Sequence, residues 1–219
     1  MAIREHFEEE VQEVKELIQE LANMGDEALT RAVESLYKKN IQIAESVIEQ
    51  DDTIDQKELE IHEKTILLIA KQQPFAKDLR RLIISLKISS DLERMADNAV
   101  NIAKSTIHLG EDHPLKIHPL IGSMADKARD MGALAIKAVK YEDISLAGKL
   151  AELDDEIDEM YGTVIREMLD ETISNPQMNQ YMMQMAFSAR YIERYADHIT
   201  NIGENIFYLV KGENYDLNE

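Results

Sequence analysis

Four pairs of acidic residues share one spacing, and they are the residues in this sequence best suited to binding a ligand. The two carboxylates of each pair are four positions apart: Asp51 and Asp55, Glu93 and Asp97, Asp154 and Asp158, and Glu193 and Asp197. On a helix this spacing places both carboxylates on one face. The chain has no cysteine, and a site built only from oxygen ligands suits hard cations such as Mg²⁺ or Mn²⁺, and also iron.

The first two pairs are predicted to form one cluster around a helical hairpin at Pro74. Asp51 and Asp55 lie 23 and 19 residues before this proline. Glu93 and Asp97 lie 19 and 23 residues after it. At about 1.5 Å per residue, two antiparallel helices would place all four carboxylates about 30 Å from the turn.

The same arrangement recurs around Pro176. Asp154 and Asp158 precede this proline by 22 and 18 residues, and Glu193 and Asp197 follow it by 17 and 21 residues. A chain this acidic contains several i, i+4 acid pairs by chance, so a single pair means little. Two independent matches in register predict a second cluster of four carboxylates.

The acids also lie close to the apolar stripes of their helices. Asp51 and Glu93 occupy seam positions, where carboxylates repel one another and lose hydration unless they are protonated, paired or bridged by cations. Pairing with Lys or Arg at the bundle edge is the competing interpretation, and Arg94 and Arg194 are adjacent in sequence to two of the acids. The third interpretation is that the acids form a solvated face of the helices and have no role beyond structure.

Three further side chains are candidate ligands. Asn101 and Asn201 follow the last acid of each cluster by one helical turn and offer amide oxygens. His198 is adjacent to Asp197 and offers a nitrogen, although a lone surface histidine is more often inert.

The elements that must position these residues are predicted to be helices throughout. Apolar residues recur mainly at helical spacing. With only 8 Gly and 4 Pro, the chain has few of the residues that form the many turns of a β protein. Breaks at Asn40, Pro74, Glu142-Asp143 and Asn175-Pro176 divide it into long helices. The expected helices are 4–39, 41–73, 77–109, about 120–141, about 144–174 and a last one ending near Gly212.

The two halves of the chain resemble each other, which indicates an internal duplication. Residues 92–97 read LERMAD and residues 192–197 read IERYAD, and both are followed by Asn-Ile four residues later. The best linker is the segment 110–119. The predicted fold class is therefore all-α, with two similar three-helix bundles at 1–110 and 111–219.

The composition excludes several classes of function. A formal net charge of −19 repels phosphate backbones, so no nucleic-acid partner is expected. The acidic N-terminal segment lacks the apolar core of a signal peptide, and no apolar run is long enough for membrane insertion. With no cysteine to form disulfides, we expect a cytoplasmic protein.

Long segments resemble the PhoU family of phosphate transport accessory proteins. In the first half these are residues 47–104, including the runs Gln72-Gln73-Pro74 and Leu86-Lys87-Ile88-Ser89-Ser90-Asp91-Leu92-Glu93-Arg94. In the second half they are residues 191–202 and 208–213. The resemblance covers essentially the whole chain and includes its duplicated plan.

The resemblance implies a function that spacing alone does not supply. It implies a non-enzymatic negative regulator of phosphate uptake and phosphate-starvation signalling. Its implied partners are the ATPase subunit of the phosphate ABC transporter and a sensor histidine kinase, and it implies a homodimer. Metal ions (Mg, Mn, Fe or Zn) are implied on acid-x-x-x-Asp motifs that match the four pairs above.

Some positions depart from the family pattern. Ala96 and Ala196 stand where the family often has glycine, and Asn98 stands where it often has histidine. A methyl group narrows the space beside an acid pair, and Asn98 removes a nitrogen ligand. The two clusters are therefore expected to differ in metal or occupancy.

Three other functions compete with this one. A di-iron bundle enzyme needs Glu-x-x-His motifs, and no histidine of this chain has a glutamate three residues before it. A metal-binding or metal-storing carboxylate bundle without a phosphate-signalling role is the main alternative. A plain scaffold with only surface acids would bind no cation tightly.

Overall fold

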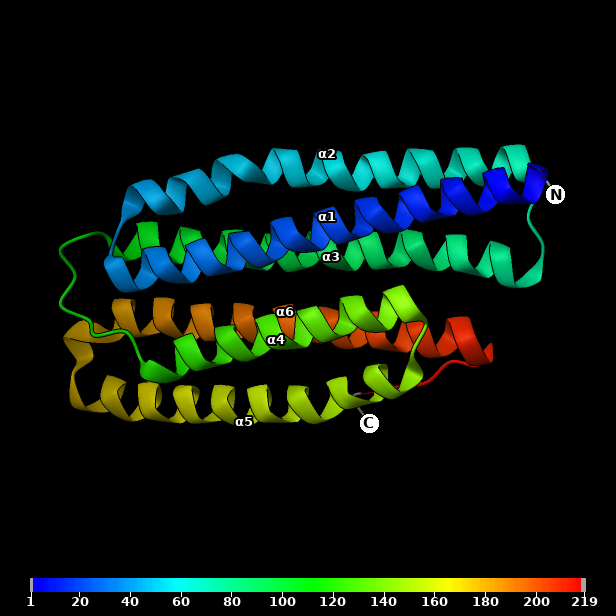
Figure 1. The fold of residues 1–219 in the computed structure, drawn as a ribbon. Helices are drawn as coiled ribbons and strands as arrows, with labels where there is room; N and C mark the ends of the chain where they lie inside the picture. Colours follow the sequence, from blue (N-terminus) through cyan, green and yellow to red (C-terminus); the bar gives the residue numbers. More distant parts are fainter. Residues whose placement is uncertain (1, 218–219) are drawn as a thin grey trace.

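The structure is a computed structural model that describes residues 2–217, and it is helical with no strand in that range (Figure 1). Six long α-helices and one short 3₁₀ helix make up the described chain. They are α1 (Ala2–Lys38), α2 (Ile41–Gln72), α3 (Ala76–Leu109), α4 (Pro119–Tyr141), α5 (Ile144–Ser174), the 3₁₀ helix η1 (Pro176–Met178) and α6 (Asn179–Lys211). The predicted all-α class is confirmed. No helix in the described range combines the length and apolar character needed to cross a membrane.

The helices end at the predicted breaks because local capping interactions stop them there. The Asn40 side chain accepts a hydrogen bond from the backbone N–H of Ile43 at 2.9 Å, which caps the start of α2. Asp143 caps α5 in the same way, while Glu142 before it closes α4 in the left-handed conformation. The short helix η1 was not predicted. It begins at Pro176, whose missing N–H and fixed φ suit the first position of a helix.

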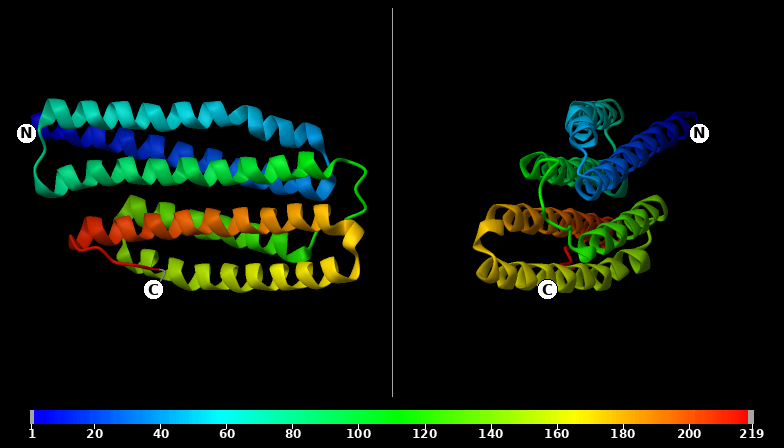
Figure 2. Two further views of the ribbon diagram at one scale, coloured as in Figure 1. Left: turned by 180° about the vertical axis from the view of Figure 1, so that it is seen from behind. Right: turned by 90° about the vertical axis from the view of Figure 1, so that its left-hand side faces the viewer.

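The six helices form two stacked three-helix bundles, as predicted (Figures 1 and 2). Helices α1–α3 form the first bundle and α4–α6 the second. The α2–α3 turn and the α5–α6 turn lie at opposite ends of the molecule (Figure 1), so α3 and α6 run antiparallel. These two helices contact each other more extensively than any other pair, so the interface between the bundles contains the most extensive single helix contact of the described chain.

A single hydrophobic core extends through both bundles. It includes Leu29 and Val47 from the first bundle and Ala128 and Ile157 from the second, all fully buried. A smaller group around Leu82 lies near the N-terminal end of α1. Residues 110–118 link the bundles, and the boundary between residues 110 and 111 stays a prediction, because the continuous core does not mark where one domain ends.

A partly buried ion-pair cluster also joins the bundles. The Glu142 carboxylate, at the α4–α5 turn, accepts from Arg81 at 2.7 Å and lies 3.0 Å from Lys77 and 3.9 Å from Lys15. Burial raises the pKa of Glu142, but hydrogen bonds from Lys77 and Arg81 outweigh it and lower the pKa overall. One carboxylate therefore holds three cations of the first bundle.

Replacing this carboxylate should destabilise the protein. We expect Glu142→Gln to lower the free energy of unfolding by about 1–2 kcal/mol, because it leaves the partly buried Arg81 and Lys15 without a counter-charge. Urea denaturation at neutral pH measures the effect. Glu152→Gln removes the same charge from an exposed position on α5 and should change stability by less than about 0.5 kcal/mol. Equal effects of the two substitutions would contradict the assigned role.

Candidate metal centres

The first acidic cluster consists of Asp51 and Asp55 on α2 with Glu93 and Asp97 on α3. Carboxylates on one of these helices raise the pKa values of carboxylates on the other. Burial and then the charges of Asp97 and Asp55 raise the pKa of Asp51. Burial, followed by the charges of Asp97, Glu58 and Asp55, raises the pKa of Glu93 to about 7. The two predicted pairs therefore meet at the same height of the α2–α3 hairpin.

None of these four carboxylates forms an ion pair or hydrogen bond with any residue in the described part of the chain. Lys104 acts on Asp51 only as a distant charge that lowers its pKa slightly against the dominant effect of burial. Arg94 has the same weak influence on Glu93. The competing interpretation, in which basic side chains neutralise the acids, therefore does not describe this cluster.

The second acidic cluster consists of Asp154 and Asp158 on α5 with Glu193 and Asp197 on α6. Burial and then the charges of Asp158, Asp197 and Glu193 raise the pKa of Asp154 to about 7. Burial and then Asp197 raise the pKa of Glu193 to about 7. The second pair of predicted motifs has therefore also been brought together.

The second cluster is more enclosed than the first and has one basic neighbour. Asp154 and Glu193 are 7% and 8% exposed. Arg190, one turn before Glu193 on α6, donates to Glu193 Oε1. The pairing interpretation thus holds for one carboxylate of this cluster, and its partner is Arg190 rather than the adjacent Arg194.

Two oxygen atoms of the second cluster are buried without a hydrogen-bond partner among the described residues: Asp154 Oδ1 and Glu193 Oε2. A buried acceptor left unsatisfied costs about 1–3 kcal/mol, and more if it is charged. Such atoms call for a missing partner, and a cation would satisfy both, because carboxylate oxygens are the ligands that hard cations prefer. The donor set of this cluster therefore fits a bound metal ion.

The remaining predicted ligands lie differently. The Asn201 amide nitrogen is 3.4 Å and His198 Nδ1 is 3.2 Å from Asp91 Oδ1 on α3, so both side chains join α6 to the other bundle. The Asn101 side chain forms no hydrogen bond with any described residue. No interaction places Asn101, Asn201 or His198 in an acidic cluster, and their role as ligands stays a prediction.

Glu58 belongs beside the first cluster, although the sequence analysis did not single it out. It raises the pKa values of Glu93 and Asp55 after the larger effect of burial on each. Its Oε1 accepts from Ser90 Oγ at 2.7 Å and lies 3.4 Å from His62 Nε2. Its position three residues after Asp55, on the same helix face, is the signal that would have found it.

In the conformation described for residues 2–217, no three Asp, Glu or His side chains converge tightly enough to hold an ion by themselves. Repulsion between like charges accounts for this spacing, since Arg190 beside Glu193 is the one basic partner of the described carboxylates in either cluster. A cation bound there would draw the carboxylates together. The helices thus bring the acids of each cluster to the same height, but the carboxylates are not drawn together around an ion.

The raised pKa values predict an unusual pH dependence for the metal-free protein. Glu93, Asp154 and Glu193 bind protons more tightly when folded than when unfolded, since their folded pKa values are about 7 and those of unfolded carboxyls are about 4. These three groups therefore stabilise the folded protein fully below about pH 4, and this contribution is lost as the pH rises through about 7. In EDTA, we expect the free energy of unfolding to be about 1–3 kcal/mol lower at pH 7.5 than at pH 5. Stability that rose across this range would contradict the clusters' protonation.

Fold and site together define a class: a duplicated all-helical bundle protein with an acidic cluster on the second and third helices of each repeat. The PhoU domain model matches residues 18–106 and again residues 121–206. This chain belongs to the PhoU family. The two matches fall on the two bundles.

Similar proteins extend over almost the full length of the chain. A phosphate-specific transport system accessory protein PhoU homolog of Aquifex aeolicus is 40% identical over 93% of this chain and 92% of that protein. A PhoU homolog of Clostridium acetobutylicum is 32% identical over 99% of both chains. The crystal structure of PhoU from Pseudomonas aeruginosa has a TM-score of 0.89 at 29% identity, covering 94% of this chain and all of that one.

Proposed function

We propose that this protein is a cytoplasmic regulator of phosphate homeostasis. It restrains phosphate uptake and phosphate-starvation signalling when phosphate is ample, by acting between the ATPase subunit of the phosphate ABC transporter and a sensor histidine kinase. The observation that carries the proposal is the full-length similarity to proteins named as phosphate-specific transport system accessory proteins. A homodimer, as in the sequence-based expectation, is part of the proposal. No catalytic step is assigned to the chain.

The two acidic clusters are proposed to bind divalent or iron-type cations. Support comes from the eight carboxylates gathered at corresponding heights of both bundles and from the two orphaned oxygens of Asp154 and Glu193. A bound cation would neutralise the repulsion within each cluster. It would also tie α2 to α3 and α5 to α6, and so fix the outer faces of the two bundles.

The regulatory role is tested in a bacterium whose own copy has been deleted. The readout is a phosphate-starvation reporter in phosphate-replete medium, with and without this chain, combined with affinity capture of the tagged chain and mass spectrometry. Silencing of the reporter, with recovery of the transporter ATPase and a sensor kinase, is the expected result. A folded and abundant chain that neither silences the reporter nor recovers these proteins would overturn the proposal.

The alternative is a carboxylate bundle that binds or stores metal without a signalling role, and the unpaired acids of the first cluster favour it. The reporter assay, combined with metal analysis of the purified protein, separates the two functions. A regulator with two sites should hold a few ions per chain, and amide substitutions in the clusters should alter reporter silencing. A metal store should leave the reporter unaffected, whatever its metal content.

A further inference from the structure

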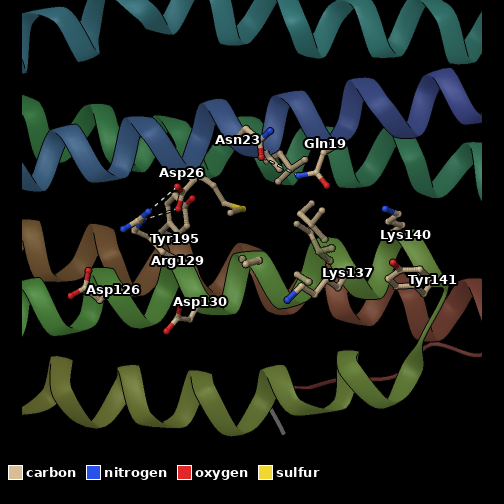
Figure 3. Close-up of a pocket in the computed structure, with 18 residues that line it drawn as sticks. Gln19, Asn23, Asp26, Asp126, Arg129, Asp130, Lys137, Lys140, Tyr141 and Tyr195 are labelled. Carbon is tan, nitrogen blue, oxygen red and sulfur yellow. Dashed lines mark hydrogen bonds and ion pairs between the residues drawn. The ribbon is translucent and has the colours of Figure 1, made fainter.

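A cavity of about 740 Å³ lies between the two bundles, away from both acidic clusters (Figure 3). Its walls are α1 and α4, and its floor is formed by side chains of α3 and α6, including Leu92 and Tyr195. Interfaces between domains are common places for small-molecule sites, and this volume is in the range of such pockets.

Two ion pairs between the bundles bound the cavity. At one end, Asp26 on α1 binds Arg129 on α4 through two hydrogen bonds of 2.8 and 3.1 Å. Beyond the other end, Lys15 on α1 lies 3.9 Å from Glu142. Between these pairs, over about 20 Å of α4, the walls carry Asp130, Lys137 and Lys140 of α4 and Gln19 and Asn23 of α1, while Asp126 lies beyond Arg129 (Figure 3).

The second end carries an excess of positive charge, which is unusual in a protein of net charge −19. Lys137 and Lys140 line the cavity, and neither forms an ion pair with any residue the structure describes. Lys15, Lys77 and Arg81 stand next to this end and share Glu142. This end of the cavity therefore attracts an anion, and lysines are common ligands of phosphate.

The first end combines the carboxylates of Asp26, Asp126 and Asp130 with Arg129 and with one neutral hydrogen-bonding group, the hydroxyl of Tyr195. Tyr195 is 2% exposed and contributes to the cavity, yet its hydroxyl forms no hydrogen bond with any described residue. The hydroxyl reaches α1, since a Cβ added at Gly25 would lie 3.8 Å from it. A hydroxyl without a partner that lines a cavity is free to donate a hydrogen bond to an occupant.

The floor argues for a small polar occupant rather than a partner helix. Its apolar side chains, among them Leu92, Met95 and Ile202, are each at most 3% exposed. A helix docking by its apolar face would find little apolar surface to bury there. The walls are mixed: Gln19 and Asn23 on α1 and the lysines of α4 line the cavity together with Ala133 and Ile136 (Figure 3).

We propose that this cavity binds a small phosphate-bearing molecule of about nucleotide length. Its anion would lie at Lys137 and Lys140, and a neutral polar group would bond the Tyr195 hydroxyl. Eight residues separate Arg129 from Lys137 on α4, or about 12 Å, and this span sets the length of the ligand. Because α1 and α4 belong to different bundles, an occupant would bridge them.

Isothermal titration calorimetry of the full chain in EDTA tests the proposal, with AMP, inorganic phosphate, adenosine and citrate as probes. We expect saturable AMP binding with a Kd of about 1 mM or tighter, and weaker binding of phosphate and of adenosine, each of which fills one end only. No saturable binding of AMP would overturn the proposal, as would citrate binding more tightly than AMP, which would assign the positive end to carboxylates.

Variants separate the two ends. The double substitution Lys137→Gln and Lys140→Gln should raise the Kd for AMP at least about tenfold, which is a loss of about 1.4 kcal/mol of binding free energy. Lys116→Gln with Lys149→Gln removes the same charge from exposed positions outside the cavity and should leave the Kd within about twofold. Tyr195→Phe should weaken the binding of AMP but leave the binding of inorganic phosphate unchanged. Equal effects of the two lysine pairs, or no effect of Tyr195→Phe on AMP, would overturn the two-ended site.

Discussion

Replacing Asp154 with Asn and Glu193 with Gln should change the stability of the protein in opposite directions with and without metal. In EDTA the double variant should be more stable than the wild type by about 1–3 kcal/mol at pH 7.5, because two buried carboxylates that repel each other become neutral. With Mn²⁺ present, the wild type should be stabilised and the variant should not. Thermal unfolding with and without Mn²⁺ measures both effects.

The size of the metal effect follows from linkage. A ligand that binds only the folded state at 100 times its Kd stabilises it by about 2.7 kcal/mol. The orphaned oxygens Asp154 Oδ1 and Glu193 Oε2 are the atoms that the substitutions alter, so the loss should be specific to them. Stabilisation of the double variant by Mn²⁺ equal to that of the wild type would show that these residues are not ligands.

A matched control keeps the change in charge constant. Glu152→Gln with Glu159→Gln removes two charges from exposed positions on the same helix, outside the cluster. This control should leave both the metal-free stability and the Mn²⁺ effect close to those of the wild type. A rise in metal-free stability in the control would assign the effect to net charge rather than to the cluster.

The sequence predicts the placement of the eight acids well because placement along helices depends on simple geometry. A rise per residue and a turn position are enough to bring Asp51 near Asp97, and the charge of Asp97 raises the pKa of Asp51, after the larger effect of burial. Helix ends at Asn40 and Glu142 are similarly local, since capping involves only neighbouring residues.

What the sequence does not predict depends on how the bundles meet. His198 is adjacent to Asp197 in the chain, but its ring faces Asp91 on the other bundle. Neither Arg129 nor Tyr195 stands out in sequence, and only the packing of α1 against α4 makes them walls of a cavity. Periodicity identifies which face of a helix is buried, but it does not identify the second bundle that covers α3.

The shared core predicts that the two bundles unfold together. Ile199 on α6 is fully buried in the core that runs through both bundles. We expect Ile199→Ala to lower the free energy of unfolding by about 3–4 kcal/mol. Because α3 and α6 form the most extensive helix contact, the loss should be transmitted from α6 to the first bundle.

Hydrogen exchange resolved by peptide measures this coupling. In the wild type, the slowest amides of α2 and α5 should exchange with the same free energy of opening, as expected for one cooperative unit. Ile199→Ala should reduce both values by the same amount. Ile173→Ala, at a position 79% exposed on α5, should reduce neither by more than about 0.5 kcal/mol. If Ile199→Ala accelerates exchange in α5 and leaves α2 unchanged, the bundles are energetically separate domains, and the packing of α3 on α6 is too weak to couple them.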